Sequence, residues 1–166
     1  MSVHKHTQFS GKLLRVKLSD LDEIASIEQD CFDAALRWTN EEFAPYFEKP
    51  QSLSTIFSMA VLPAKKTSPK IYAGYSLASI EEGNTGTILS IAVRQSFRGQ
   101  GLGFLMLENL YKNLMRKKVT TIDLQVEDTN LAAIKLYRDF GFIETGRLPD
   151  YYAPGRHGLQ MELVKA

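Results

Sequence analysis

Apolar and polar residues alternate with a period of two along several short stretches in the first half of the chain. Residues 13–18 place apolar side chains against basic ones, a pattern that is typical of a half-buried strand. Residues 54–62 and 71–81 are rich in apolar and β-branched residues, and they stand on either side of a loop, 63–69, that contains two prolines. With a further strand over 87–93, the pattern predicts an antiparallel meander of three strands after the first strand.

Apolar residues at helical spacing predict four helices, which cover residues 20–32, 39–47, 99–117 and 130–140. In the first helix, the residues at this spacing are Leu21, Ile24, Ala25, Ile27 and Glu28. The second helix begins with a capping box, Thr39-x-x-Glu42. Gly141 follows the last helix and supplies its C-terminal stop.

The end of the chain predicts three more strands, over 121–127, 142–147 and 158–164, with Tyr151 and Tyr152 in the loop between the last two. Together these elements predict an α/β fold in a single domain, residues 12–166. Its mixed, mostly antiparallel sheet should have six to seven strands, with about four helices on its two faces. Residues 1–11 are expected to form a flexible lead.

Composition and charge change this picture by excluding several classes of protein. The 166 residues include 44% apolar and 23% charged residues, with a net charge of +1. This balance is typical of one globular domain and gives no bulk attraction for nucleic acid or an anionic membrane. Cys31 is the only cysteine and there are three histidines, so no internal disulfide and no zinc-ligand spacing is available. Since no apolar run reaches 18 residues and residues 1–10 do not form a signal peptide, we expect a cytoplasmic protein without a metal.

The most informative motif is a glycine cluster between a predicted strand and the long helix, Arg98-Gly99-Gln100-Gly101-Leu102-Gly103. Glycines allow backbone N–H groups to converge on a ligand, and a helix N-terminus carries a partial positive charge, so the motif favours a phosphate site. A tight turn without a ligand is the alternative. A dinucleotide fingerprint requires a small residue at the position of Phe104, and a P-loop requires a Gly-Lys-Ser/Thr sequence that is absent.

The residues around this cluster resemble the GNAT superfamily of N-acetyltransferases. Residues 98–103 match its pyrophosphate loop, Arg/Gln-x-x-Gly-x-Gly/Ala, and the flanking motifs follow in order: Ile91-Ala92-Val93, Leu124 to Asn130, Ala133 to Tyr137 and Phe140 to Phe142. The resemblance covers about residues 13–164 and is most specific from residue 88 onward. It implies acetyl-coenzyme A as the cosubstrate, contacted by Ile91, Ala92, Val93, Arg98, Gly99, Gln100, Gly101, Leu102, Gly103, Phe104, Asn130 and Tyr137.

Within the superfamily, the chain is most similar to N-terminal protein acetyltransferases, particularly those that act on ribosomal-protein alanine termini. Residues 28–43 resemble the substrate-side loop of that branch, and residues 146–163 resemble its tyrosine-bearing hairpin. The resemblance implies that Trp38, Tyr151 and Tyr152 contact the acceptor. Core packing is the alternative for Trp38, and ordinary surface exposure is the alternative for the two tyrosines.

The resemblance also implies catalytic roles. Tyr137 is expected to be the general acid that protonates the departing thiolate, with packing in the core as its alternative. A backbone N–H near Val93 is expected to bind the thioester oxygen. The branch usually has a glutamate base where this chain has Gln125, which takes up no proton at neutral pH but can orient a water or the amine. Glu127, on the same face of the predicted strand, is a candidate for the missing base, with a solvated charge as its alternative.

The missing glutamate bears on the acceptor. An α-amine has a pKa of about 7.7–8.0 and is partly neutral near pH 7, whereas a lysine side chain has a pKa of about 10.4. A weak base therefore suits an α-amine, and the leading hypothesis is transfer of an acetyl group from acetyl-coenzyme A to the N-terminal α-amine of a protein. Acetylation of a small-molecule amine is the second hypothesis. The third is a catalytically idle protein that binds acetyl-coenzyme A, which Gln125 keeps open.

Overall fold

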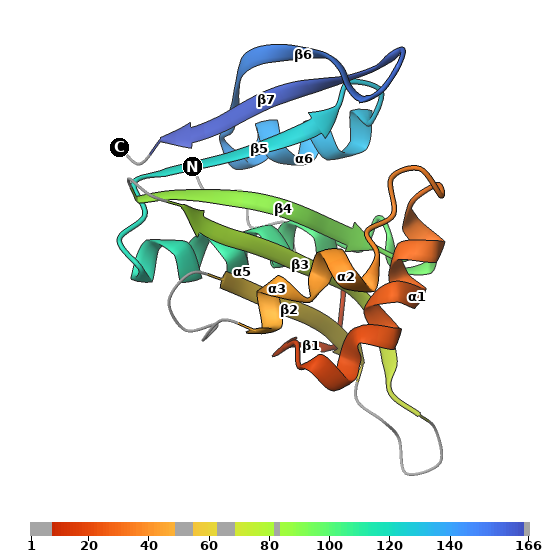
Figure 1. Cartoon of the computed structure of the whole chain (residues 1–166). Helices are drawn as coiled ribbons and strands as arrows, with labels where there is room; N and C mark the ends of the chain where they lie inside the picture. The colour runs from red at the N-terminus through yellow and green to blue at the C-terminus, as the bar shows by residue number, and fades with distance from the viewer. Residues whose placement is uncertain (1–7, 49–54, 63–68, 82–83, 165–166) are drawn as a thin grey trace.

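The computed structural model describes residues 8–48, 55–62, 69–81 and 84–164. A seven-stranded sheet forms its centre, in the order β1-β2-β3-β4-β5-β7-β6 (Figure 1). The strands are β1 (Lys12–Arg15), β2 (Thr55–Leu62), β3 (Ile71–Glu81), β4 (Thr85–Val93), β5 (Thr121–Glu127), β6 (Ile143–Ala153) and β7 (Arg156–Val164). Neighbouring strands are antiparallel except β4 and β5, which are parallel. The predicted mixed, mostly antiparallel sheet is therefore confirmed.

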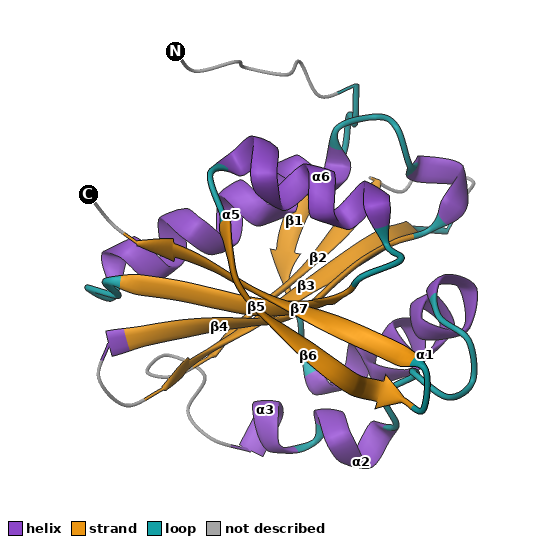
Figure 2. Ribbon diagram, turned by 90° about the horizontal axis from the view of Figure 1, so that it is seen from above, coloured by secondary structure: helices purple, strands orange, loops and turns teal. Residues whose placement is uncertain are grey.

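Helices cover both faces of the sheet, as predicted. The α-helices in the described residues are α1 (Leu21–Cys31), α2 (Asn40–Phe43), α3 (Pro45–Glu48), α5 (Leu102–Arg116) and α6 (Leu131–Phe140). Figure 2 shows α5 and α6 on one face and α1, α2 and α3 on the other. Short 3₁₀ turns at Leu18–Asp20 and Gln95–Phe97 precede α1 and the glycine cluster.

The sequence explains where the helices begin and end. The Thr39 side chain accepts from the N–H of Glu42, and the Glu42 carboxylate accepts from the N–H of Thr39, so the predicted capping box is confirmed. Asn130 caps α6 through the N–H of Ala133. Gly141 ends α6 with φ at 119°, a left-handed conformation that favours glycine.

Several predicted boundaries were wrong. The strand expected over 13–18 ends at Arg15, and the helix expected over 39–47 is divided into α2 and α3, with Pro45 at the start of the second piece. The larger error concerns the final hairpin, because β6 continues to Ala153 and contains both tyrosines that were expected in a loop. The pairing of β6 with β7 shifts between Leu148 and Ala153, and Tyr151 and Tyr152 lie within this irregular segment.

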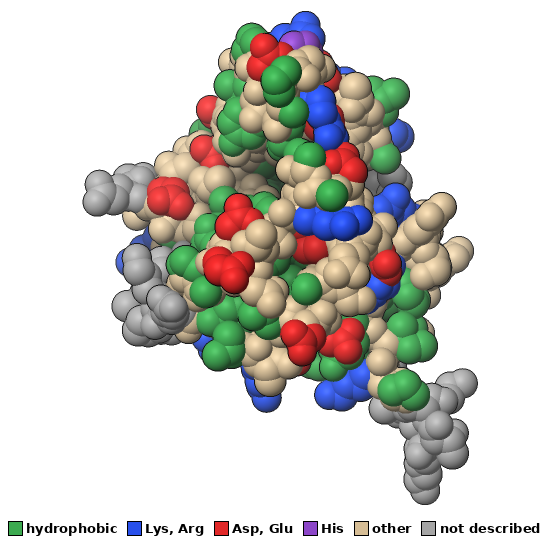
Figure 3. Space-filling model, turned by 45° about the vertical axis from the view of Figure 1, so that its right-hand side comes forward, with side chains coloured by type: hydrophobic (Ala, Val, Ile, Leu, Met, Phe, Trp, Pro, Cys, Tyr) green, Lys and Arg blue, Asp and Glu red, His purple; other side chains and the backbone are tan. Residues whose placement is uncertain are grey.

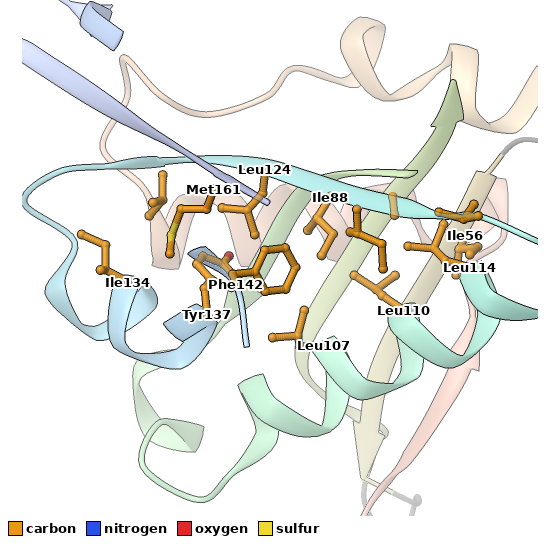
Figure 4. Packing of buried hydrophobic residues seen from close by; sticks show 14 of the residues in the cluster. Ile56, Ile88, Leu107, Leu110, Leu114, Leu124, Ile134, Tyr137, Phe142 and Met161 are labelled. Atoms are coloured by element: carbon orange, nitrogen blue, oxygen red, sulfur yellow. The ribbon is translucent and has the colours of Figure 1, made fainter. Parts of the chain in front are cut away.

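The apolar side chains pack on both faces of the sheet. One cluster lies between α5, α6 and strands β4, β5 and β7. In Figure 4, Leu107 and Leu110 of α5 point toward the strand residues Ile88 and Leu124. A second cluster lies on the face covered by α1 and α2, and Ile24, Ile27 and Phe43 are fully buried in it. Burial of one such side chain stabilises a fold by about 1.5–3 kcal/mol.

Part of the expected N-terminal lead packs against the domain. Residues 1–7 lie outside the described residues. Phe9 is buried and packs edge to face on Phe97, and the N–H of Gln8 donates to the carbonyl of Gln100. In the described segments, no helix is long and apolar enough to span a bilayer.

Two irregularities in β4 prepare a site. Its pairing with β5 runs only from Thr85 opposite Thr121 to Ile88 opposite Leu124, and the two strands then separate (Figure 1). Its register with β3 shifts just after Ile88, so Leu89 is an extra residue in a bulge. Beyond Ile88, the edge of β4 that faces β5 is therefore free to contact a ligand.

Candidate active site

Two adjoining cavities open where β4 and β5 separate. The larger has a volume of about 600 Å³ and the smaller about 340 Å³, both within the range of small-molecule sites. The residues that line both are Phe32, Leu36, Ile91, Glu127, Asn130, Ala133 and Tyr137. The cavities therefore meet at the carboxyl end of β5 and the first turns of α6.

The glycine turn forms one end of the larger cavity. Gly99 and Gly101 have φ angles of 75° and 81°, and a Cβ atom on Gly99 would meet nothing within 4 Å. Gly101 is the N-cap of α5, so the N–H groups of Leu102, Gly103 and Phe104 have no acceptor within the helix. A turn with open space beside glycine and three converging N–H groups fits a phosphate group.

Of the twelve residues predicted to contact the cosubstrate, all but Gln100 line this cavity. Gln100 instead supports the turn. Its side-chain amide donates to the backbone carbonyl of Ser96, and its backbone carbonyl accepts from the backbone N–H of Gln8. Arg98 lines the cavity with its guanidinium turned back, so that Nε donates to the carbonyl of Val93 at 2.9 Å. The arginine thus holds the glycine turn against the end of β4.

Tyr137 lies at the junction of the two cavities. It projects from α6 beside Phe142, with the ring centroids 5.7 Å apart (Figure 4). Burial raises the pKa of Tyr137 to about 12. The phenol is therefore fully protonated at neutral pH, but transfer of its proton to a thiolate of pKa about 8.5 is unfavourable by roughly three to four pKa units. A role as general acid requires the transfer to accompany cleavage of the carbon–sulfur bond.

Two polar side chains of β5, those of Gln125 and Glu127, line the smaller cavity. Gln125 Nε2 donates to Gln160 Oε1 of β7 at 2.8 Å, which leaves the Gln125 carbonyl oxygen as an acceptor. Glu127 lines both cavities, but its two oxygens accept from Arg156 Nε at 2.6 Å and Nη2 at 3.0 Å. Arg156 also reaches Asp33, at 3.0 Å. Glu127 is therefore a partner in an ion pair that ties β5 to the hairpin and to the loop after α1.

The three predicted acceptor-binding residues come together at the smaller cavity. Trp38, Tyr151 and Tyr152 all line it. Trp38 also packs on Phe43, with ring centroids 5.2 Å apart, so core packing and cavity lining are both parts of its environment. Tyr151 is 52% exposed and meets Tyr152 edge to face, while burial raises the pKa of Tyr152.

One polar residue of this cavity, Glu28, was not predicted from the sequence to belong to the site. It lies on α1, is 1% exposed, and lines the smaller cavity. Its Oε1 accepts from the Tyr75 hydroxyl at 2.5 Å, and its Oε2 accepts from the N–H of Trp38 at 2.8 Å. The signal was present in the sequence, because Glu28 shares the helical spacing of the apolar stripe with Ile24 and Ile27.

Within the described segments, no group of three or more His, Cys, Asp and Glu residues is placed to hold a metal ion. Cys31 is the last residue of α1 and lines the larger cavity, where burial raises the pKa of its thiol. Figure 3 shows acidic and basic side chains interspersed over one face of the molecule, as the net charge of +1 leads one to expect.

The geometry thus provides a phosphate-binding helix terminus, a free strand edge beside a phenol, and a second cavity with polar and aromatic walls. A long ligand with a phosphate at one end can lie along β4 and α5 and reach Tyr137. A second reactant can meet it there from the smaller cavity. Positioning two reactants at one point is a large part of group-transfer catalysis.

A sequence model of the acetyltransferase (GNAT) family matches residues 21–142. The chain is 31% identical over 137 residues to the ribosomal protein bS18-alanine N-acetyltransferase of Salmonella typhimurium, a match that covers 81% of this chain and 90% of that protein. It is 30% identical over 158 residues to an N-alpha-acetyltransferase of Sulfolobus acidocaldarius, covering 87% of this chain and 86% of that protein.

Solved structures have the same fold. The crystal structure of the ribosomal-protein-S18-alanine N-acetyltransferase from Escherichia coli matches with a TM-score of 0.76 and 25% identity, over 93% of both chains. An acetyltransferase from Salmonella typhimurium, in a structure with its cofactor acetyl-CoA, matches with a TM-score of 0.74 and 17% identity over 93% of this chain and 94% of that chain, which shows a shared fold.

Proposed function

We propose an acceptor for this chain, which belongs to the acetyltransferase (GNAT) family and is an N-acetyltransferase with acetyl-coenzyme A as donor: the N-terminal α-amine of a protein. One observation carries the proposal. Two relatives named for acetylation of a ribosomal-protein alanine and of α-amines are similar to this chain over more than four fifths of its length.

In this proposal the larger cavity binds acetyl-coenzyme A, which supplies an activated acetyl thioester. The N–H groups of Leu102, Gly103 and Phe104 bind its pyrophosphate, and the missing side chain of Gly99 leaves the space that this requires. The free edge of β4 along residues 91–93 binds the arm that carries the thioester and offers N–H groups to the thioester oxygen. Tyr137 holds its proton near the sulfur.

The acceptor enters through the smaller cavity. Its volume of about 340 Å³ suits one or two residues at the start of an extended peptide. Tyr151 and Trp38 form aromatic walls for the first side chain, and the Gln125 carbonyl oxygen accepts from the amine. With no carboxylate at position 125, the site favours an amine of low pKa, and an α-amine meets this requirement better than a lysine side chain.

An acceptor panel tests the proposal, with turnover measured as thiol release from acetyl-coenzyme A. Peptides with a free small N-terminal residue should be acetylated. The same peptides blocked at the N-terminus but carrying an internal lysine serve as the matched control and should be inert. If polyamines or blocked peptides are the better substrates, the α-amine assignment is wrong and a small-molecule or lysine acceptor takes its place.

A variant of the smaller cavity separates the two binding sites. Tyr151→Ala removes an aromatic wall at a half-exposed position, so the fold should tolerate it. We expect the KM for the peptide to rise about tenfold, while the Kd for acetyl-coenzyme A stays unchanged. An unchanged peptide KM would remove Tyr151 from the acceptor site.

A further inference from the structure

A chain of hydrogen bonds leads from the smaller cavity into the protein interior. Ser90 of β4 lines the cavity, and its Oγ lies 2.9 Å from the Tyr75 hydroxyl of β3. The Tyr75 hydroxyl donates to Glu28 Oε1 at 2.5 Å. Tyr75 and Glu28 are 0% and 1% exposed, whereas Ser90 is partly exposed, so Ser90 is the more accessible of the two cavity-lining residues in this series, Ser90 and Glu28.

The bulge in β4 places the Ser90 side chain beside Tyr75, within this series of hydrogen bonds. Ile88 packs toward α5, whereas Leu89 and Ala92 pack with the α1 cluster. Because the bulge at Leu89 shifts the alternation by one residue, Ser90 faces the α1 side as well, next to Tyr75.

The direction of the protons follows from the donors. Tyr75 has one hydroxyl proton and gives it to Glu28, so its oxygen accepts from the Ser90 hydroxyl. Ser90 Oγ then keeps lone pairs that can accept from an N–H of a molecule in the cavity that Ser90 lines. We propose that Ser90, Tyr75 and Glu28 form a proton relay that removes a proton from the acceptor ammonium in place of the carboxylate that position 125 lacks.

The relay balances in protons. The ammonium gives one proton to Ser90 Oγ, the Ser90 hydroxyl proton moves to Tyr75, and the Tyr75 proton moves to Glu28 Oε1. The amine is left neutral with a lone pair to attack, and Glu28 is left as a neutral carboxylic acid. After the product leaves, the same chain returns the proton to water in the open cavity. No other reactant is needed.

The surroundings of Glu28 support its role as the final acceptor. Burial raises the pKa of Glu28, and the Glu42 carboxylate of α2 raises it further. The Tyr75 hydroxyl, the Trp38 N–H and the Arg37 guanidinium lower it, and Cys31 is a further titratable group near the chain. Burial and the Glu28 carboxylate raise the pKa of Tyr75 well above its usual range, so Tyr75 passes a proton without storing a charge.

The relay rests on the proposed function for its substrate, and its test is a pH profile. In Glu28→Gln, which keeps the size of the side chain, only the neutral amine can react. For an α-amine of pKa about 8, the neutral fraction falls about fifteenfold from pH 8 to pH 6.5, so the loss of kcat/KM relative to the native chain should be about fifteenfold larger at pH 6.5. Ser90→Ala should show the same trend. Ser76→Ala is the matched control, because within the described residues Ser76 Oγ is buried without a partner.

A second acceptor distinguishes Glu28 as a proton acceptor from Glu28 as a residue that only supports the structure of the site. A peptide that begins with trifluoroalanine has an amine of lowered pKa and needs no base, so its turnover should be nearly equal in the native chain and in Glu28→Gln. A folded Glu28→Gln with a pH-independent loss would overturn the relay, and a pH-dependent loss in that variant alone would overturn the part of Ser90. If Glu28→Gln does not fold, Ser90→Ala decides by the same criterion. A native chain that turns over no peptide at all contradicts the α-amine proposal instead, and the relay is then tested with whichever amine is accepted.

Discussion

Arg156 and Glu127 form a two-point ion pair across β7 and β5, and it occupies both carboxylate oxygens of the residue that the sequence offered as a substitute base. Arg156 holds Asp33 as well, so this guanidinium joins the hairpin to the loop after α1. Both oxygens of the Glu127 carboxylate already accept from Arg156, so this side chain is engaged in holding β5 to β7.

Glu127→Gln should therefore change the structure of the site more than its pH dependence. We expect kcat/KM to fall by less than tenfold and by the same factor from pH 6.5 to pH 8.5, since no base is removed. The matched control is Glu144→Gln, which breaks the exposed pair with Arg138 away from both cavities. If the loss in Glu127→Gln grows steeply at low pH while Glu144→Gln stays native, Glu127 is the base after all.

Substitution of two glycines that share a backbone conformation can distinguish a loss of ligand binding from the cost of backbone strain. Gly99 and Gly155 have φ angles of 75° and 76°, and a Cβ atom on either would meet nothing within 4 Å. Alanine at each position should cost about 1–2 kcal/mol of stability. Only Gly99 lines the larger cavity, so Gly99→Ala should weaken binding of acetyl-coenzyme A about tenfold in a calorimetric titration, and Gly155→Ala should not. Equal affinities would remove Gly99 from the pyrophosphate site.

Much of the fold was predictable because local and tertiary preferences agree in several elements. β3 and β5 begin and end at the predicted residues, since alternation and flanking turns define both strands. The tyrosine hairpin was not predictable. Asp150 adopts a φ of 52°, and its side chain accepts from the N–H of Gly155. β6 therefore continues through an irregularity for which the sequence contains no recognisable turn motif. The buried Glu28 was visible only as a position on a helical stripe, since its partner Tyr75 is 47 residues away.

Tyr137→Phe tests the general acid. The substitution keeps the ring that packs on Phe142, so the fold and the affinity for acetyl-coenzyme A should be unchanged. We expect kcat to fall about 10²–10⁴-fold. Tyr111→Phe is the control, because Tyr111 packs on Phe140 and lines neither cavity. A kcat within threefold of the native value would leave Tyr137 as a packing residue.

The raised pKa of Tyr137 also predicts how stability depends on pH. Because burial raises this pKa from 10 to about 12, the neutral phenol stabilises the fold fully below pH 10, and this contribution is lost as the pH rises toward 12. The loss approaches about 3 kcal/mol for a shift of two pKa units. Urea unfolding of the native chain and of Tyr137→Phe between pH 9 and 11.5 isolates it, because other buried tyrosines titrate in both. A constant difference in the free energy of unfolding would contradict the burial of the hydroxyl.

Gln125→Glu introduces the carboxylate that the family resemblance led us to expect at this position, and the structure limits what it can add. Gln125 Nε2 now donates to Gln160 Oε1, so a carboxylate at position 125 requires the Gln160 amide to turn and donate instead. Because the relay from Ser90 to Glu28 already removes the proton, we expect at most a several-fold gain in kcat/KM, largest below pH 8. Gln160→Glu, which adds the same charge on β7, should give no gain.

The double variant Glu28→Gln with Gln125→Glu tests whether a carboxylate at position 125 can replace Glu28 as the base. If the new carboxylate replaces the relay, it should restore the activity at pH 6.5 that Glu28→Gln alone loses, so that the double variant has nearly the pH profile of Gln125→Glu. Independent roles would instead give effects that multiply at every pH, as expected for residues that do not share a step. A native chain without turnover that Gln125→Glu alone activates would show that the relay does not work, because the ammonium would then have had no base until position 125 supplied one.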